Sequence, residues 1–299
     1  MQPVVYVHKW WHDYLETSIK QTLKNNKDVI LIGDEKNEFV AKKYNITHVM
    51  FDEYNHNDFD KYYVHNKKNT NYQFELFCFQ RWLVLLEVMK KLDISKCVYL
   101  DSDILYYWNI DKEISRISKF WNFDLAFPNL SWHTTYVFSR DALKKFCDFM
   151  INHYKDKKLY DRLLKWPLIW QPWISDMTIF QLYINDYPDK VYDLTKDYWD
   201  NIVYDDFINW GSGYKTYFGK KDFIIKSNKV YFKNPNWSKV ETKTLHFQMH
   251  MKTYMWIVYD KKIFLYKLLL LWNYCVEWLY FKVPFIRVLR KKRKDKHLF

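Results

Sequence analysis

The stretch Cys97-Val98-Tyr99-Leu100-Asp101-Ser102-Asp103 joins an apolar run to two carboxylates that are one residue apart. The apolar run predicts a buried strand. Because a strand points alternate side chains to the same side, Asp101 and Asp103 are expected to face one pocket while Ser102 turns aside. Paired carboxylates suit a hard cation such as Mg²⁺ or Mn²⁺, and these ions commonly chelate a diphosphate. The stretch therefore predicts a metal and diphosphate site at a strand end.

Strands and helices are predicted in alternation on both sides of this stretch. Apolar runs predict further strands at 4–7, 28–34, 47–51, 123–127 and 134–138. Helical spacing predicts helices at 13–24, 39–44, 72–91, 139–154 and 175–183. Residues 52–71 are expected to form a long loop, and residues 187–244 follow no regular pattern. The alternation predicts an α/β fold, with helices on both faces of a mostly parallel sheet.

The length of 299 residues permits one large domain or two small ones. Neither a repeat nor a low-complexity linker divides the chain before its last part. We therefore expect a single three-layer α/β/α domain over residues 1–260 and a tail over residues 261–299. The first residues do not have the pattern of a secretory signal.

Glycine and cysteine usage narrows the possible chemistry. The four glycines leave no G-x-G-x-x-G or P-loop pattern, so we expect a phosphate to be bound by metal and side chains. The four cysteines form neither a C-x-x-C pair nor a zinc spacing, and their apolar contexts predict buried, reduced thiols. A reducing compartment follows as an expectation.

The net charge of +12 is concentrated at the end of the chain. Residues 282–299 contain eight Lys or Arg and one Asp, which is +7 of the total. The remaining +5 is spread over the body of the protein. Nucleic-acid binding would prefer a basic stripe on the fold itself, so we expect no nucleic-acid partner.

Arg81 lies on the apolar face of the helix predicted at 72–91, between Phe74 and Phe77. A charge on such a face needs a partner. One interpretation is a structural salt bridge or a side chain that extends to solvent. The other is an arginine that reaches an anionic ligand at the strand end, and the acidic pair on the next strand favours it.

A second polar element, Leu245 to Lys252, lies near the end of the predicted domain. His246 can supply a nitrogen ligand to complete a site with two carboxylates, and Lys252 can neutralise a diphosphate. His250 is the alternative ligand, and His246 is preferred.

These residues resemble the motifs of glycosyltransferases of the GT-A fold. The Asp101-Ser102-Asp103 segment is similar to their D-x-D motif, and His246 and Lys252 match the ends of the H-x-x-G-x-x-K element of the retaining, galactosyltransferase-like (LgtC-like) branch. In that branch the histidine completes the metal site and the lysine contacts the diphosphate. The resemblance covers about residues 1–255. It departs at Met249, where the family has Gly, and at Thr253-Tyr254, where Pro-Trp is usual.

The resemblance implies roles for three further residues. Arg81 matches a basic residue that contacts the donor, and His8, after the first strand, lies where such folds bind the nucleotide base. Asp176 matches an acidic residue that faces the transferred sugar or the acceptor, although it also suits a helix N-terminus. In an inverting enzyme Asp176 would take the acceptor proton, whereas in a retaining enzyme the leaving phosphate can do so.

The resemblance implies a metal-dependent hexosyltransferase. The expected cofactor is Mn²⁺ or Mg²⁺, bound by Asp101, Asp103 and His246. The expected donor is a nucleotide-sugar, with UDP-hexose preferred, and the expected acceptor is a polysaccharide or a lipid-linked glycan. The spacing of His246 and Lys252 favours the retaining branch.

The tail combines an apolar stretch with a basic end. Residues 263–281 are near the length of a membrane span, but Lys267 and Glu277 lie inside the stretch and disfavour one. We expect an amphipathic helix at an anionic membrane surface, followed by a polybasic end. The predicted location is peripheral, at the cytoplasmic face of the membrane. The alternative is an ordinary packed helix with a disordered end.

Three other functions fit parts of the pattern. A membrane-docked, non-enzymatic carbohydrate-binding protein would use the 15 tryptophans as stacking surfaces. A haloacid-dehalogenase-like phosphatase also has Asp-x-Asp after a strand, but it expects Thr or Val where Leu105 stands. A sugar nucleotidyltransferase normally needs a glycine-rich loop that this chain does not have.

Overall fold

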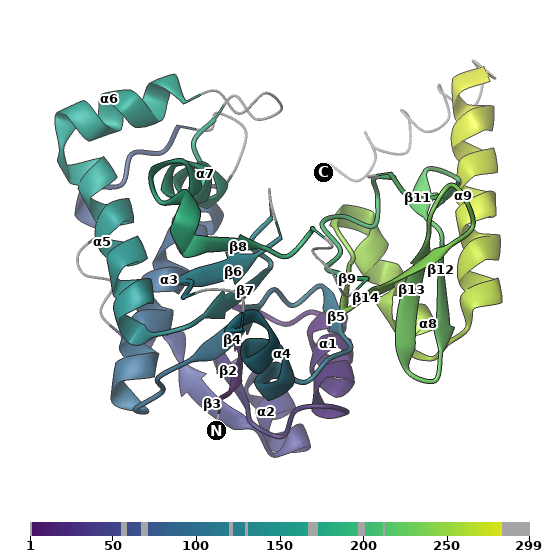
Figure 1. The fold of residues 1–299 in the computed structure, drawn as a ribbon, viewed down its shortest axis with the longest axis horizontal. Coiled ribbons are helices and arrows are strands. Elements are labelled where there is room, and N and C mark those ends of the chain that lie inside the picture. The colour runs from purple at the N-terminus through teal and green to yellow at the C-terminus, as the bar shows by residue number, and fades with distance from the viewer. Residues whose placement is uncertain are drawn as a thin grey trace, which may run out of the picture.

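The computed structural model describes residues 2–54, 59–66, 71–119, 122–128, 131–166, 173–196, 201–211 and 213–282. A large α/β part comprises the residues up to Lys196, and a smaller part of short strands and two helices follows it (Figure 1). The polybasic residues after Lys282 lie outside the described residues.

A seven-stranded sheet forms the centre of the large part. Its strands, in spatial order, are β3 (Thr47–Met50), β2 (Val29–Gly33), β1 (Val4–Val7), β4 (Cys97–Leu100), β7 (Thr134–Val137), β6 (Leu125–Phe127) and β8 (Val191–Asp193). Strand β7 is antiparallel to both its neighbours, and all other pairings are parallel. The predicted α/β fold with a mostly parallel sheet is confirmed.

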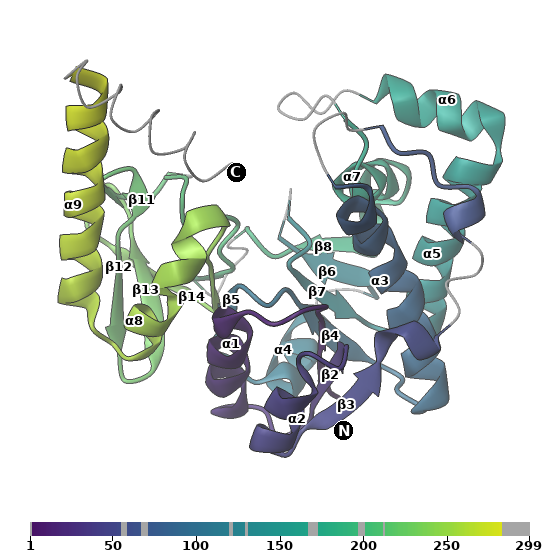
Figure 2. The same ribbon diagram turned by 180° about the vertical axis from the view of Figure 1, so that it is seen from behind.

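Helices cover both faces of this sheet (Figure 2). One face packs against α1 (Asp13–Leu23), α2 (Glu38–Tyr44) and α4 (Ile110–Ile117). The other packs against α3 (Tyr72–Lys91), α5 (Arg140–Lys155) and α7 (Asp176–Asp186), with α6 (Lys157–Lys165) beside α5. Short 3-10 turns are η1 (Phe51–Glu53), η2 (Phe59–Lys61) and η3 (Pro188–Lys190). Because the central strands are continuous apolar runs, each face of the sheet is covered by its own core, and the result is three layers.

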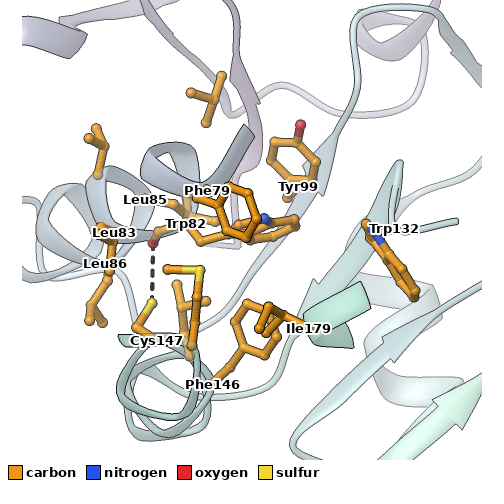
Figure 3. Close-up of a cluster of buried hydrophobic side chains, with 14 of the residues drawn as sticks. Phe79, Trp82, Leu83, Leu85, Leu86, Tyr99, Trp132, Phe146, Cys147 and Ile179 are labelled. Atoms are coloured by element: carbon orange, nitrogen blue, oxygen red, sulfur yellow. Dashed lines mark hydrogen bonds between the residues drawn. The ribbon is translucent and has the colours of Figure 1, made fainter. Parts of the chain in front are cut away.

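Trp82 is the centre of the core between α3 and the sheet (Figure 3). Its ring lies 4.7 Å from that of Tyr99 on β4 and 4.9 Å from that of Phe180 on α7. The Cys147 thiol on α5 donates to the Trp82 carbonyl at 3.5 Å. This packing fixes α3 against β4, and it therefore also fixes Arg81, the residue before Trp82.

The smaller part is built from strands that the sequence pattern did not predict. They are β9 (Ile202–Val203), β10 (Thr216–Tyr217), β11 (Lys220–Lys221), β12 (Phe223–Lys226), β13 (Lys229–Lys233), β14 (Lys239–Thr242) and β15 (Thr244–His246). Strands β12, β13, β14 and β9 form one sheet in that order. Strand β15 pairs with β5 (Ile104–Tyr106), directly after the acidic pair, and so joins the two parts.

After β15 the chain forms η4 (Met249–Tyr254), α8 (Met255–Tyr259) and α9 (Ile263–Lys282). Helix α9 packs on the smaller part through Tyr266 and Leu270, and Lys267 pairs with Asp222 at 2.6 Å. In the part of the chain that the structure describes, no helix is long and apolar enough to span a membrane.

Two cysteines, Cys97 and Cys147, are buried as predicted. Cys78 is half-buried, and Cys275 on α9 is exposed, so the prediction of buried thiols is wrong for Cys275. Cys275 is exposed because it lies on the side of α9 away from Tyr266 and Leu270.

Candidate functional site

Two adjoining cavities meet at the carboxyl end of β4. The first, about 310 Å³, lies beside the loop after β1 and includes His8, Trp10 and Tyr14 in its wall. The second, about 410 Å³, opens toward the smaller part and includes His246 and Asp176. Six residues border both cavities: Phe74, Cys78, Arg81, Asp101, Asp103 and Lys252. The structure thus brings all seven residues singled out from the sequence to one place.

Asp101 begins the turn after β4 and is anchored at both its backbone and its carboxylate. Its N–H donates to the His133 carbonyl at 2.7 Å. Its Oδ1 accepts from Arg81 Nη1 at 2.9 Å and from the Tyr99 hydroxyl. Burial raises the pKa of Asp101, but Arg81 and Tyr99 outweigh it, and the pKa lies below its usual value. Asp101 is therefore an ionised carboxylate with one oxygen already bonded.

Asp103 is more deeply buried and is bonded on one oxygen only. Its Oδ2 lies 3.0 Å from Lys252 Nζ. Its Oδ1 is buried, has no hydrogen-bond partner among the residues that the structure describes, and lies 3.6 Å from His246 Nε2. Burial raises the pKa of Asp103, and Lys252 reduces the effect in part. An unpaired buried carboxylate oxygen is costly, and this one is at the meeting point of the cavities.

His246 presents a lone pair to that oxygen. Its Nδ1 lies 2.8 Å from the Asp206 carbonyl, which can only accept, so Nδ1 carries the proton. Burial lowers the pKa of His246 to about 4, so the ring is neutral at pH 7 and Nε2 is an acceptor. Two acceptors, Asp103 Oδ1 and His246 Nε2, therefore face each other with no hydrogen between them.

This arrangement fits a cation between the two parts of the protein. Carboxylate oxygen and neutral imidazole nitrogen are ligands for Mn²⁺, and a carbonyl bonded to Nδ1 is the usual way in which a ligating histidine is oriented. Within the described residues no three His, Cys, Asp or Glu side chains form a ready metal cluster. Asp103 and His246 are the best-placed pair, with Asp101 adjacent but engaged by Arg81. His250 is exposed on η4 and does not border either cavity.

A buried ion cluster supports His246 from behind. Lys221 Nζ lies 2.7 Å from Asp205 Oδ1 and also contacts Asp206 Oδ1. The other oxygen of Asp205 accepts from the His246 N–H at 2.8 Å. The Asp206 carbonyl accepts from His246 and lies 3.2 Å from His133 Nε2. The cluster thus fixes the tautomer and direction of the imidazole.

Arg81 and Asp176 form a second buried ion pair in the cavity wall. Arg81 Nη2 donates to Asp176 Oδ2 at 2.6 Å, and Trp82 Nε1 donates to the same oxygen at 3.4 Å. Burial raises the pKa of Asp176, although Arg81 opposes the shift. Arg81 therefore makes the structural salt bridge that the sequence allowed, and it also borders both cavities. The guanidinium is shared between Asp101 and Asp176.

The loop after β1 forms one wall of the first cavity. The ring of His8 connects Ser102 Oγ, 2.9 Å from Nδ1, with His12 Nδ1, 3.0 Å from Nε2. Burial, helped by the neighbouring His12, lowers the pKa of His8 to about 3. The His12 ring stacks on Tyr14, at 4.9 Å between centroids. His8 is thus a neutral, buried spacer beneath an aromatic surface.

Trp10 continues this wall in a left-handed backbone conformation, with φ of 70°. Its N–H donates to Asp34 Oδ2 at 2.6 Å, and its carbonyl accepts from Asn37 Nδ2 at 3.2 Å. Asn37 also donates to the His8 carbonyl at 2.7 Å. A Cβ at Gly33 would lie 2.0 Å from Asn37 Oδ1, so only glycine leaves room for this support.

Several residues of the site were not identified from the sequence. Tyr99 donates to Asp101 through its hydroxyl, and the His133 carbonyl accepts from the Asp101 N–H. Asp205 accepts from the His246 N–H, and Lys221 pairs with Asp205 and Asp206. Of these residues, only Tyr99 could have been identified from the sequence. It is two residues before Asp101, and residues two apart on a strand share a face.

No protein-family model and no curated protein matches this sequence. Solved structures do match in fold. Mouse xyloside xylosyltransferase 1 in its apo form aligns with a TM-score of 0.48 and 11% identity, over 64% of this chain and 84% of that one. The galactosyltransferase LgtC, with donor and acceptor sugar analogues, aligns with a TM-score of 0.40 and 11% identity, over 65% and 73%. A cytidylyltransferase from Leptospira borgpetersenii aligns with a TM-score of 0.36 and 12% identity, over 64% and 74%. The chain is structurally similar to GT-A glycosyltransferases, and the likeness is one of fold alone.

Proposed function

We propose that this protein is a metal-dependent glycosyltransferase that moves a hexosyl group from a nucleotide-sugar, preferably a UDP-sugar, to a glycan or glycolipid acceptor. One observation carries the proposal. Asp103 Oδ1 and His246 Nε2 are two acceptors that face each other at 3.6 Å, beside the cations Lys252 and Arg81. A divalent ion such as Mn²⁺ or Mg²⁺ satisfies both acceptors, and the flanking cations suit the phosphates that accompany such an ion.

The charge of the site suits departure of a diphosphate. A bound divalent ion would supply Lewis-acid stabilisation of the leaving group. Lys252 would add a point charge on the same group, and Arg81, which borders the same cavities, would add a second one. These groups are held by ion pairs before substrate arrives, so little reorganisation is needed as negative charge develops.

The two cavities suit different parts of the donor and the acceptor. The first cavity has an aromatic wall of Trp10, His12 and Tyr14, which suits a planar base. The second cavity has Asp176 and His246 at its base and suits the transferred sugar and the acceptor. Asp176 Oδ2 accepts from Arg81, so Asp176 is better suited to positioning Arg81 than to taking a proton. Retention of the sugar configuration, with the departing phosphate as proton acceptor, is therefore part of the proposal.

The phosphatase alternative is not favoured, because Leu105 stands where that family expects Thr or Val.

Isothermal titration of UDP with and without Mn²⁺, together with a hydrolysis screen over nucleotide-sugars, tests the proposed function. We expect UDP to bind at least about tenfold more tightly with Mn²⁺ and one class of donor to be hydrolysed. A UDP affinity that is the same with and without Mn²⁺, together with no hydrolysis of any donor, would overturn the proposal. Sugar binding without any turnover would favour the carbohydrate-binding alternative.

We also propose that α9 docks on an anionic membrane surface, which suits a lipid-linked acceptor. Phe264, Leu268 and Trp272 lie four residues apart along α9 and are exposed, with Phe264 at 83%. The basic sequence that follows Lys282 complements anionic headgroups. A peripheral location at the cytoplasmic face stays a prediction.

Co-sedimentation with vesicles tests the docking proposal. We expect binding to phosphatidylglycerol vesicles, loss of binding in 1 M NaCl, and weaker binding by Phe264→Asp/Trp272→Asp, because the change places charge in the apolar face. Equal binding to phosphatidylcholine vesicles, or no effect of the double substitution, would count against it.

A further inference from the structure

Met249 stands out because its backbone and its side chain are both unusual for a methionine. Its φ is 52°, in the left-handed region that favours glycine. Its side chain is 78% exposed, and it borders the second cavity. Met249 therefore offers exposed apolar surface to a ligand in that cavity.

The backbone around Met249 is fixed on both sides. The Phe247 N–H donates to the Asp103 carbonyl at 2.9 Å, and the Met251 N–H donates to the Gln248 carbonyl at 3.0 Å. Phe247 and Met251 are themselves fully buried in the core of the smaller part. The left-handed conformation is therefore imposed by its surroundings, and glycine would adopt it more easily.

Two more exposed apolar side chains border the same cavity. Phe74 on α3 is 50% exposed, and Trp210, between β9 and β10, is 49% exposed. With Met249 they form what we call the apolar rim, contributed by three separate segments of the chain. The base of the cavity is instead charged, through Asp101, Asp103, Arg81, Asp176 and Lys252.

We infer that the apolar rim binds the apolar aglycone of an amphiphilic acceptor glycoside while the acceptor sugar reaches the charged base. This inference rests on the proposed function and adds the acceptor class to it. A charged base suits polyhydroxylated and phosphorylated groups, whereas the rim offers apolar surface that a sugar alone would leave exposed to water. The rim would bind an alkyl chain attached to the acceptor sugar. Met249 and Trp210 border the second cavity and not the first, so their substitution should leave binding of the nucleotide base unchanged.

The test compares octyl and methyl glycosides of galactose, glucose and N-acetylglucosamine as acceptors, below the micellar concentration, with the donor that the hydrolysis screen identifies. For the wild-type protein we expect kcat/KM to be at least about tenfold higher for the octyl than for the methyl form of the accepted sugar, because several methylene groups are buried. Met249→Gly and Trp210→Ala should each lower that ratio by about threefold or more.

Trp237→Gly is the matched control. Trp237 is also left-handed, with φ of 67°, and 68% exposed, but it lies in the turn between β13 and β14 and does not border either cavity. Its variant should leave the octyl-to-methyl ratio unchanged. Met249→Gly should retain or raise the melting temperature, because the strain is relieved.

The outcomes separate the two proposals. A wild-type protein that hydrolyses no nucleotide-sugar would overturn the proposed function. A protein that hydrolyses its donor but accepts no glycoside of the set, or that uses octyl and methyl forms equally, would overturn the acceptor class alone. A ratio that Trp237→Gly lowers as much as Met249→Gly does would also overturn it.

Discussion

Two buried charge clusters lie next to each other in this protein, and they differ in how completely they are satisfied. In the cluster of Asp205, Asp206 and Lys221, the lysine pairs with both carboxylates, and the second oxygen of Asp205 accepts a backbone N–H. In the cluster around Asp103, one carboxylate oxygen accepts no hydrogen bond from the described part of the chain and faces the lone pair of His246.

The difference indicates which cluster has a structural role and which one can bind a ligand. A closed cluster holds its neighbours in one conformation and has no remaining capacity for a ligand. An open cluster has an acceptor that is not hydrogen-bonded, and binding of a cation would remove the cost of leaving it so. The cluster of Asp205, Asp206 and Lys221, which we call the closed cluster, orients His246. His246 belongs to the cluster around Asp103, which we call the open cluster, so the open cluster depends on the closed one for the position of its histidine.

The largest effect is expected from neutralising the open cluster. Asp103→Asn should lower donor turnover by about 10³-fold or more, because the ion and the leaving group lose their charge partner. Steady-state hydrolysis of the nucleotide-sugar measures the change. Asp189→Asn, at an exposed position outside both cavities, is the control and should be neutral. Retention of more than a tenth of the turnover by the Asp103 variant would contradict the assignment.

Substitutions in the closed cluster are expected to lower the stability of the protein. Lys221→Met removes the cation from the buried carboxylate of Asp205 and the half-buried carboxylate of Asp206, and it should lower the free energy of unfolding by about 3–5 kcal/mol. Lys252→Met removes the cation from one carboxylate only, at a lysine that is itself about a third exposed, and should lower the free energy of unfolding by a smaller amount. Urea denaturation measures both. Equal losses from the two variants would remove the distinction between the clusters.

A smaller effect is expected at the link between the clusters. His246→Ala should weaken Mn²⁺-dependent UDP binding by about 10- to 100-fold, because a nitrogen ligand is lost. His250→Ala, at an exposed position four residues on, should leave the affinity as it is. Isothermal titration compares the two variants, and a larger loss in the His250 variant would reverse the ligand assignment.

The smallest effect concerns pH in the metal-free protein. Burial lowers the pKa of His246 to about 4, whereas an unfolded histidine titrates near 6.5. Between these values the unfolded chain binds the additional proton, so stability falls as the pH drops from about 6.5 to 4, by at most about 1.4 kcal/mol per pH unit. His246→Gln should show a shallower slope in urea titrations across that range, and an unchanged slope would mean that this imidazole is not held neutral.

The large α/β part was predictable because its signals are local. Apolar runs and helical spacing located each strand from β1 to β4 and the long helix α3, whose bounds, Tyr72–Lys91, match the prediction. The smaller part was missed because its strands are two to five residues long and lysine-rich. One of their pairings joins β9 to β14, about forty residues away. Such strands are defined by their partners and not by their own sequence.

The same limit applies within the site. Residue type and spacing identified Asp101, Asp103 and His246, because ligand chemistry restricts which side chains are suitable. Their geometry could not be predicted, since it depends on backbone groups such as the carbonyl of Asp206 and on the hydroxyl of Tyr99. That Arg81 would bond to both Asp101 and Asp176 also needed the fold, because α7 approaches α3 only in three dimensions.

The pairing of β15 with β5 has a consequence for how ligands enter. His246 lies opposite Ile104 in this ladder, and the Phe247 N–H bonds to the Asp103 carbonyl, so the imidazole and the carboxylate share one short stretch of sheet. Hinge-like separation of the large and small parts would tear that ladder. Ligands are therefore expected to enter and leave through movement of loops and side chains at the cavity mouths, while Asp103 and His246 keep their positions relative to each other.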